Sequence, residues 1–454
     1  MLITGGRIID PATKTDAVGD VLIEAGRISS VCATKVKAPD GCVTIEAAGL
    51  IVCPGFIDLH CHLREPGYED KETIATGTRA AARGGYATVC CMPNTNPALD
   101  TRAGVDFVKA RCEAEGVVRV LPIGCITRGR KGQELADMGE MARAGVAGFS
   151  DDGDSVPDSR IMRHALEYSR TFNLPVIEHC EDKALAEGGM INEGKVAARM
   201  GLRGIPAAAE EVIVSRDLAL AEMTGARLHI AHLSTAGAVE LVRRAREKGI
   251  RVTAEVTPHH LTLTEERVMG SRWGPGAVYN IGPSPLPADA YDTYAKVNPP
   301  LRTEADRQAL IRGLKDGTID AIATDHAPHT WMDKSGEFGL AAFGCAGFET
   351  ALGVLLGLVR RGELDLLTLI SKLTHEPSLI LDPACKDLGA LTEGVVADVT
   401  LFDPEAEWVV KEADFLSKGK NSPFTGCTLR GKVVATIAAG KLAFQDLNSK
   451  AKHD

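Results

Sequence analysis

The sequence has few aromatic residues, no long apolar run and no excess of positive charge. Phe, Trp and Tyr together make up 4% of its 454 residues. Its longest clean apolar stretch, residues 351–359, has about half the length that a membrane-spanning helix requires. The formal net charge is −10, which argues against nucleic acid or an anionic membrane as the main partner. The N-terminus lacks a basic segment followed by an apolar one, so we expect no signal peptide and a cytoplasmic location.

Cysteine is present without a pattern. The twelve cysteines are scattered through apolar segments, and no two of them form a CxxC pair. We interpret them as reduced, buried residues of a cytosolic protein, and not as a disulfide framework.

The middle of the chain alternates short apolar strands with helical patterns. Hydrophobic residues make up 44% of the sequence and charged residues 25%, which is typical of a globular protein. Strands alternating with helices indicate parallel βα units, and six or more such units favour a closed (β/α)₈ TIM-type barrel over an open sheet. The predicted strands cover residues 87–92, 118–123, 148–150, 175–180, 227–233, 251–256 and 319–324. Helices are predicted at residues 158–172, 207–224 and 237–248.

Both ends of the chain show short alternating strands instead. Neither end has enough apolar residues for a core of its own, so residues 1–52 and 391–444 are predicted to form one composite, sandwich-like β domain. The barrel is then assigned to residues 53–390, and residues 445–454 form a polar tail. Residues 273–290 are rich in Gly and Pro and predict a long loop.

A pair of histidines follows the first apolar strand of the predicted barrel. Alternate residues of a strand share a face, so Asp58, His60 and His62 are expected to point the same way. Active sites of (β/α)₈ barrels lie at the carboxyl ends of the strands. We therefore interpret His60 and His62 as metal ligands.

Further histidines and acidic residues end later strands of the barrel. In the strand at residues 227–233, Leu228, Ile230 and His232 share a face, so His229 is predicted to pack on the other side. His259 and His260 also follow a strand, and we interpret them as structural residues or as residues that support the metal ligands. The candidate ligands at the later strand ends are Asp151 or Asp152, His179, His232 and Asp325.

Four histidines and two aspartates are more ligands than one tetrahedral zinc ion can bind. They suit two metal ions about 3.5–4 Å apart that share a carboxylate and a hydroxide. Imidazole and carboxylate ligands together favour Zn²⁺, with Mn²⁺, Co²⁺ or Fe²⁺ as alternatives. The predicted chemistry is hydrolysis, or its reverse, at a carbonyl centre.

Long motifs carry a resemblance to a known family. The segments PGFIDLHCHLREPG and ATDHAPH resemble the amidohydrolase superfamily. The segments FSDDG, HCED, AEVTPHHL, KVNPPLR and GFETALG follow in the order found in class I dihydroorotases, the bacterial type. With the end segments, the resemblance covers nearly the whole chain.

The resemblance implies a reaction and a role for each ligand. Dihydroorotases reversibly close N-carbamoyl-L-aspartate to L-dihydroorotate and water, in de novo pyrimidine synthesis. By resemblance, one zinc ion is held by His60, His62 and Asp325, which is also the proton shuttle. The FxDDG pattern makes Asp152 the bridging ligand, and the second zinc ion is assigned to His179 and His232.

The resemblance also implies which residues contact the substrate. Arg64, Asn94 and His329 resemble the residues that hold its carboxylate, beside His62. Asn298 resembles a residue that bonds the ring, and the backbone at Phe343 and Gly344 resembles a further ring contact. From the residues alone, Arg64 also fits a solvated charge at the barrel rim, Asn94 a turn former and Asn298 a loop residue.

Two other readings of the sequence compete with this one. Hydantoinases, dihydropyrimidinases and allantoinases share the histidine pattern but resemble one another in a carbamylated bridging lysine, and AGFSDDG has no lysine. A non-catalytic dihydroorotase-like scaffold for aspartate transcarbamoylase would have lost ligands that are present here. We expect a small-molecule substrate, a homodimer or higher homo-oligomer, and we leave open a complex with that transferase.

Overall fold

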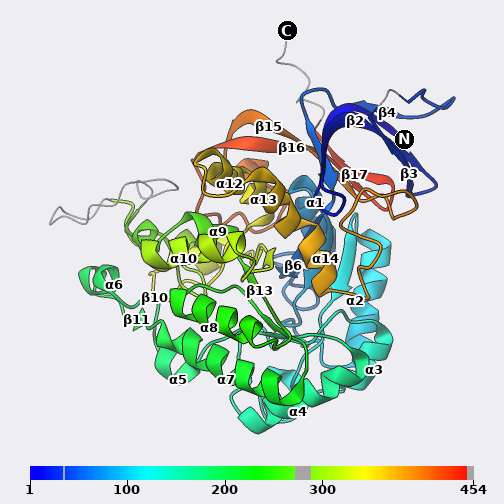
Figure 1. Ribbon diagram of the computed structural model, residues 1–454. Helices are drawn as coiled ribbons and strands as arrows, with labels where there is room; N and C mark the ends of the chain where they lie inside the picture. The colour runs from blue at the N-terminus through cyan, green and yellow to red at the C-terminus, as the bar shows by residue number, and fades with distance from the viewer. Residues whose placement is uncertain (34–35, 271–287, 447–454) are drawn as a thin grey trace.

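The computed structural model describes residues 1–33, 36–270 and 288–446 (Figure 1). In the middle of the chain, seven short parallel strands and one bridging residue form a closed barrel. One group pairs in the order β6-β7-β8 and a second in the order β14-β13-β12-β9. Phe149 bridges Gly124 and Val176 between the groups, and a Cys61–His326 bridge closes the ring. The strands are β6 (Phe56–Cys61), β7 (Tyr86–Cys91), β8 (Arg119–Pro122), β9 (Val176–Glu178), β12 (Leu228–Ile230), β13 (Val252–Val256) and β14 (Ala321–Ile322).

Helices surround this parallel barrel, so most of its strand residues are buried; in β8 three of the four residues are partly exposed (Figure 1). The α4 helix shows how the sequence builds one of them: the Asp158 carboxylate caps its first turn, and Ile161, Met162, Ala165 and Leu166 form its buried face. The longer helices are α1 (Ile74–Arg83), α2 (Arg102–Glu115), α3 (Met138–Ala144), α4 (Ser159–Ser169), α7 (Ala208–Thr224), α8 (Ala236–Glu247), α10 (Glu304–Lys315), α12 (Phe348–Arg360) and α13 (Leu366–Leu373). Shorter elements are α5 (Lys183–Ala186), β10 (Ile191–Asn192), α6 (Lys195–Met200), β11 (Gly204–Ile205), α9 (Pro258–Thr262), α11 (Trp331–Lys334) and α14 (His375–Ile380).

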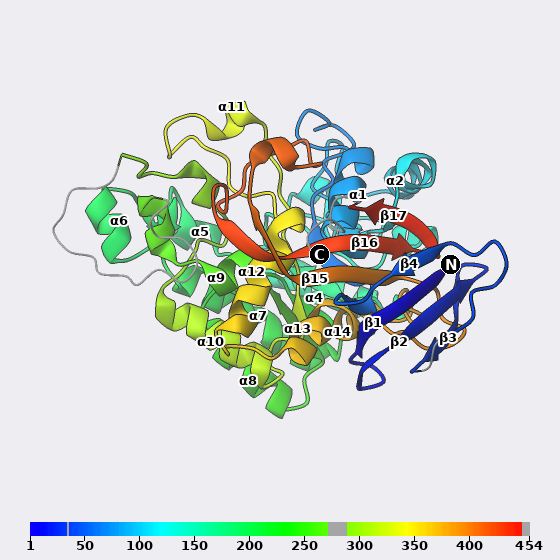
Figure 2. The same ribbon diagram turned by 90° about the horizontal axis from the view of Figure 1, so that it is seen from above.

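The two ends of the chain build one sheet beside the barrel (Figure 2). Its order is β17-β16-β15-β5-β1-β2-β3, and β4 also pairs with β1. A separate apolar core joins residues from both ends, among them Ile3, Val21, Val399 and Ile437. The strands are β1 (Leu2–Asp10), β2 (Thr15–Glu24), β3 (Arg27–Cys32), β4 (Thr44–Glu46), β5 (Ile51–Pro54), β15 (Val399–Val409), β16 (Thr428–Ala438) and β17 (Lys441–Gln445).

The structure confirms the α/β barrel and a sheet formed by both termini. The division at residues 52/53 and 390/391 stays a prediction. The predicted strand at residues 148–150 is reduced to the single bridging residue Phe149, although Gly148 and Ser150 also form backbone hydrogen bonds to Gly124. The predicted loop at 273–290 and tail at 445–454 fall largely on residues 271–287 and 447–454, outside the described ranges.

Two absences concern the described part of the chain. None of its helices is both long and apolar enough to cross a membrane. All twelve cysteines lie within it. Eight are buried as predicted, whereas Cys32, Cys42, Cys112 and Cys427 are partly exposed; their reduced state stays a prediction.

Candidate metal centre and active site

The candidate ligands meet where the barrel strands end. His60 is the second-last residue of β6, His62 lies just after the strand, and His179 directly after β9. His232 and Asp325 follow β12 and β14 with φ values of 32° and 45°. Such left-handed backbone is costly for residues other than glycine, and it turns both side chains out of their strand direction and into the site.

One group of donor atoms gathers around Asp325. Its Oδ1 lies 3.0 Å from His62 Nε2 and 3.7 Å from His60 Nε2. These three buried residues bring one ligand atom each to within 4.8 Å of one another. They are the residues predicted to hold the first metal ion.

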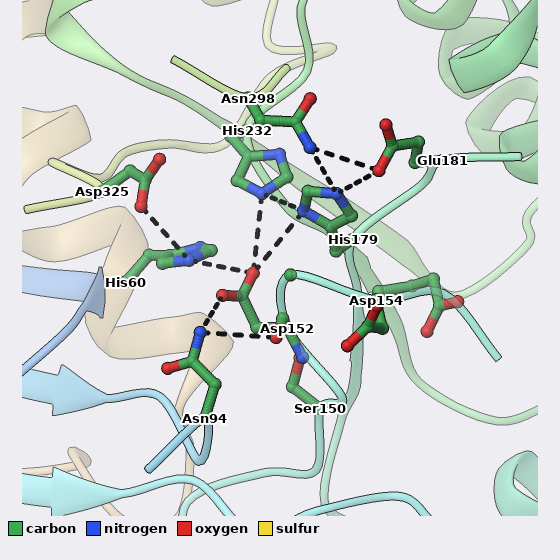
Figure 3. Close-up of polar contacts among 12 residues, drawn as sticks. His60, Asn94, Ser150, Asp152, Asp154, His179, Glu181, His232, Asn298 and Asp325 are labelled. Atoms are coloured by element: carbon green, nitrogen blue, oxygen red, sulfur yellow. Dashed lines mark hydrogen bonds and ion pairs between the residues drawn. The ribbon is translucent and has the colours of Figure 1, made fainter. Parts of the chain in front are cut away.

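A second group gathers around Asp152, and Figure 3 shows its carboxylate between three imidazoles. Asp152 Oδ1 lies 3.2 Å from His60 Nε2, 3.6 Å from His232 Nε2 and 3.7 Å from His179 Nδ1. The His179 and His232 nitrogens are themselves 3.0 Å apart. Asp152 therefore lies next to both groups, as a bridging carboxylate must.

Partners outside these groups fix which nitrogen of each ring faces inward. Glu255 Oε1 accepts a hydrogen bond from His60 Nδ1 at 2.9 Å. Asn94 Oδ1 accepts one from His62 Nδ1 at 2.8 Å. These two acceptors orient the Nε2 atom of both rings to the centre, where a metal ion would take the place of the Nε2 proton.

Two of the inner atoms lack a hydrogen-bond partner within the protein. His60 Nε2 and Asp152 Oδ1 are buried and form no hydrogen bond of acceptable geometry. Burial opposes the ionisation of Asp325, but the hydrogen bond from His62 and the nearby His60 outweigh it and hold its pKa below the ordinary range. Unpartnered imidazole nitrogen beside ionised carboxylate is the donor set of a divalent cation such as Zn²⁺, so the residues present fit the group that the sequence predicts.

A cavity of about 420 Å³ opens over this centre. His60 lies beneath its floor, fully buried. The lining contains every other residue predicted for the site: His62, Arg64, Asn94, Asp152, His179, His232, Asn298, Asp325, His329, Phe343 and Gly344.

Arg64 and His329 form one wall of the cavity. Arg64 Nε donates to the carbonyl of Pro328 at 3.3 Å, and its Nη2 lies 3.3 Å from His329 Nε2. His329 Nε2 donates to the carbonyl of Phe343 at 2.8 Å. Burial and the charge of Arg64 lower the pKa of His329 to about 2, so this imidazole is neutral and Arg64 carries the positive charge of the wall.

Comparisons with known proteins agree with this geometry. Residues 49–238 match the family model described as Dihydro-orotase-like. The chain is 49% identical to the dihydroorotase of Pelotomaculum thermopropionicum over 98% of its own length and 99% of that protein. It is 48% identical to the dihydroorotase of Geobacter sp. strain M21, at coverages of 98% and 99%. The chain belongs to the dihydroorotase family.

Solved structures establish the same fold. The L-hydantoinase (dihydropyrimidinase) of Arthrobacter aurescens superimposes with a TM-score of 0.83 at 24% identity, covering 98% of this chain and 96% of that one. The dihydropyrimidinase of Brevibacillus agri gives 0.81 at 22% identity, with coverages of 98% and 95%. At these identities the likeness shows the barrel fold alone.

The geometry of this family member decides between the two neighbouring aspartates. Asp151 Oδ1 accepts hydrogen bonds from the backbone N–H groups of Ile126 and Thr127 at 2.9 and 3.0 Å, so its carboxylate points away from the histidines. Asp152 faces them. The sequence left this choice open and only the resemblance favoured Asp152.

The face predicted for His229 is wrong. Its Nε2 lies 3.2 Å from Glu255 Oε2, and the other oxygen of Glu255 holds His60, so His229 lies on the same side of the sheet as the metal centre. Strict alternation fails because β12 ends at Ile230 and the backbone of His232 is left-handed. His260 is structural as predicted, since its Nε2 donates to the carbonyl of Pro299 at 2.9 Å.

Sequence reasoning missed three supporting residues of the site. Glu255 holds His60, and Glu181 lies 3.3 Å from His179 and 3.2 Å from the amide nitrogen of Asn298 (Figure 3). Lys183 lines the cavity and donates to Glu181 at 2.8 Å. Glu181 and Lys183 stand just after the HCED histidine, which is a local signal, whereas no pattern links Glu255 to His60 across 195 positions.

Proposed function

We propose that this protein is a dihydroorotase, an enzyme that reversibly closes N-carbamoyl-L-aspartate to L-dihydroorotate and water. One observation carries the proposal: a single cavity has four histidines and two aspartates at its base and an arginine in its wall. This combination offers a metal centre to the reacting amide and a cation to the substrate's free carboxylate. Near 50% identity to curated dihydroorotases over almost the whole chain supports it.

The metal centre of the proposal is a pair of zinc ions. His60, His62 and Asp325 would hold one ion, His179 and His232 the other, and Asp152 would contact both. When bound, such ions polarise a carbonyl group and lower the pKa of water so that hydroxide is available at neutral pH.

Arg64, Asn94 and His329 are assigned to the substrate carboxylate. The planar guanidinium of Arg64 matches a carboxylate with two parallel hydrogen bonds, and the Pro328 carbonyl already orients its Nε. Asn298 is assigned to the ring of the substrate. Its amide is oriented by Glu181, and it lines the same cavity as Arg64. The backbone of Phe343 and Gly344 completes the ring contacts.

Asp325 is assigned the proton transfers. In the hydrolytic direction its carboxylate takes the proton of the attacking hydroxide and gives it to the leaving ring nitrogen; cyclisation reverses both steps. Despite its burial, the hydrogen bond from His62 and the nearby His60 keep it ionised in the resting state, ready to act as a base.

The proposal is tested by assaying the purified protein with L-dihydroorotate, N-carbamoyl-L-aspartate, hydantoin, dihydrouracil and allantoin under one set of conditions. We expect turnover of dihydroorotate and of N-carbamoyl-L-aspartate, with the other cyclic amides at least about 100-fold slower because they lack the carboxylate that Arg64 binds. Preferred turnover of hydantoin or allantoin would assign a sibling activity instead. Absence of all turnover in zinc-loaded protein would favour the scaffold interpretation.

The remaining predictions concern partners and location. A homodimer or larger homo-oligomer, a complex with aspartate transcarbamoylase and a cytoplasmic location remain proposals from the sequence. Light scattering of the protein alone and mixed with that transferase tests the first two.

A further inference from the structure

A segment from the C-terminal part of the chain lies directly behind the substrate cavity. Within it, the side chain of Asn421 is buried, with 2% of its surface exposed. Its Oδ1 accepts a hydrogen bond from the backbone N–H of His329 at 2.9 Å. Its Nδ2 donates to the carbonyl of Gly344 at 3.1 Å. One amide side chain thus joins two residues that are assigned to opposite parts of the substrate.

The segment around Asn421 is itself firmly anchored. The backbone N–H groups of Leu416 and Ser417 donate to Glu349 at 2.9 and 3.1 Å. The carbonyl of Pro423 accepts from the Arg267 guanidinium at 2.8 Å. These bonds reach α12 on one side and the region after α9 on the other, so Asn421 is held on both flanks.

The contact with the cavity wall is close. A Cβ atom at Gly419 would lie 2.7 Å from the backbone nitrogen of His329, so only glycine allows this approach. On the far side, the N–H of Gly344 donates to the carbonyl of Lys296 at 2.9 Å, two residues before Asn298. The backbone of Gly344 is therefore bonded through its carbonyl to Asn421 and through its N–H to the segment that carries Asn298.

We propose that Asn421 is a positioning residue for substrate binding. It does not line the cavity; it fixes the separation of His329 and Gly344, so that the carboxylate and the ring of one substrate molecule are contacted together. The inference rests on the proposed function. It also gives the terminal segments a role in the active site, through a residue that the barrel does not supply.

Steady-state kinetics with L-dihydroorotate test this role in Asn421→Ala and Asn421→Asp. The Asp variant keeps the acceptor for the His329 N–H and loses the donor to Gly344. We expect KM to rise about tenfold in both variants while kcat falls by less than about threefold, because the contacts with bound substrate change and the metal centre does not. A wild-type KM in both variants would overturn the proposal.

Thr436→Val is the matched control. Thr436 is buried in β16 and its Oγ1 donates to the carbonyl of Ala82 at 2.6 Å, so the variant removes another tie between the terminal sheet and the barrel, away from the cavity. We expect its KM to equal that of wild type. A KM increase matching that of the Asn421 variants would show a general structural effect and overturn the positioning role.

Hydrogen exchange separates this inference from the proposed function. We expect the backbone amides of residues 338–346 to exchange about tenfold faster in Asn421→Ala than in wild type, and to be unchanged in Thr436→Val. Unchanged exchange in Asn421→Ala would show that Asn421 does not hold this segment in place, and would overturn the proposal. A wild-type protein without dihydroorotate turnover would refute the proposed function, and the exchange result would then still decide whether Asn421 holds the wall.

Discussion

Replacing Glu255 by glutamine tests how strongly the protein interior supports the metal centre. Glu255 is fully buried, and its two oxygens accept from His60 Nδ1 at 2.9 Å and from His229 Nε2 at 3.2 Å. Burial alone would raise its pKa, but the hydrogen bonds from His229 and His60 lower it to about 2. At neutral pH Glu255 is therefore an ionised carboxylate, and each of its oxygens accepts a hydrogen bond from one imidazole.

The glutamine side chain in Glu255→Gln has the shape of glutamate, but one of its two acceptor oxygens is replaced by an NH₂ group. Its NH₂ group must face either His60 or His229, and a hydrogen bond to a charged group is worth about 1.5–3 kcal/mol. Since about 1.4 kcal/mol corresponds to a factor of ten, losing some 2 kcal/mol weakens zinc binding about 30-fold. This lies within the range of about 10–100-fold that is typical for partners of metal-bound histidines.

The assay is competition for zinc against a chromophoric chelator, followed by turnover at saturating zinc. Asp398→Asn is the control, because Asp398, directly before β15, is a buried carboxylate away from the metal centre that accepts from the backbone N–H of Ala439 at 2.6 Å and from Arg119 at 2.5 Å. We expect the zinc affinity of Asp398→Asn to equal that of wild type. Unchanged affinity in Glu255→Gln, or the same loss in both variants, would refute the reasoning.

Three further predictions concern catalysis, binding and stability. Asp325→Asn should lower turnover by about 10²–10⁴-fold while the thermal unfolding midpoint stays within a few degrees of wild type; turnover within tenfold of wild type would exclude the proton shuttle. Arg64→Lys should raise KM for dihydroorotate about tenfold, because an ammonium cannot form the paired bonds, and an unchanged KM would remove Arg64 from the carboxylate site. Burial lowers the pKa of Lys334 from 10.5 to about 7. The unfolded chain therefore binds more protons than the folded one between these pH values, and the free energy of unfolding should rise with pH by up to about 1.4 kcal/mol per unit. Denaturation at pH 7 and 9 should show a smaller rise in Lys334→Met, and an equal rise would contradict the assignment.

Much of this architecture can be predicted from local sequence patterns. Alternating apolar strands and amphipathic helices predict the barrel, and polar residues at strand ends predict the site, since all parallel strands end at the same rim. The capped helix that begins after Asp158 needs only its own sequence. His60 and His62 are close in the sequence, so their convergence could be predicted from the strand alone.

The remainder depends on long-range contacts or on irregular backbone. The side of the sheet on which His229 lies could not be predicted, because His232 leaves the strand with a left-handed backbone that no alternation rule contains. The choice between Asp151 and Asp152 depends on which backbone N–H groups are free to bind a carboxylate. Glu255 and Asn421 act across 195 and 92 positions, and nothing near either residue in the sequence indicates its partner.

We propose that the six histidine and aspartate ligands hold the ions on which dihydroorotate turnover depends. The most direct test of this claim is to strip the metal with a chelator and to titrate zinc back while bound zinc and dihydroorotate turnover are both recorded. We predict no turnover in the metal-free protein and a plateau of turnover at two zinc ions per chain. Full turnover without metal, or zinc bound at these ligands with no turnover of dihydroorotate, would contradict the claim.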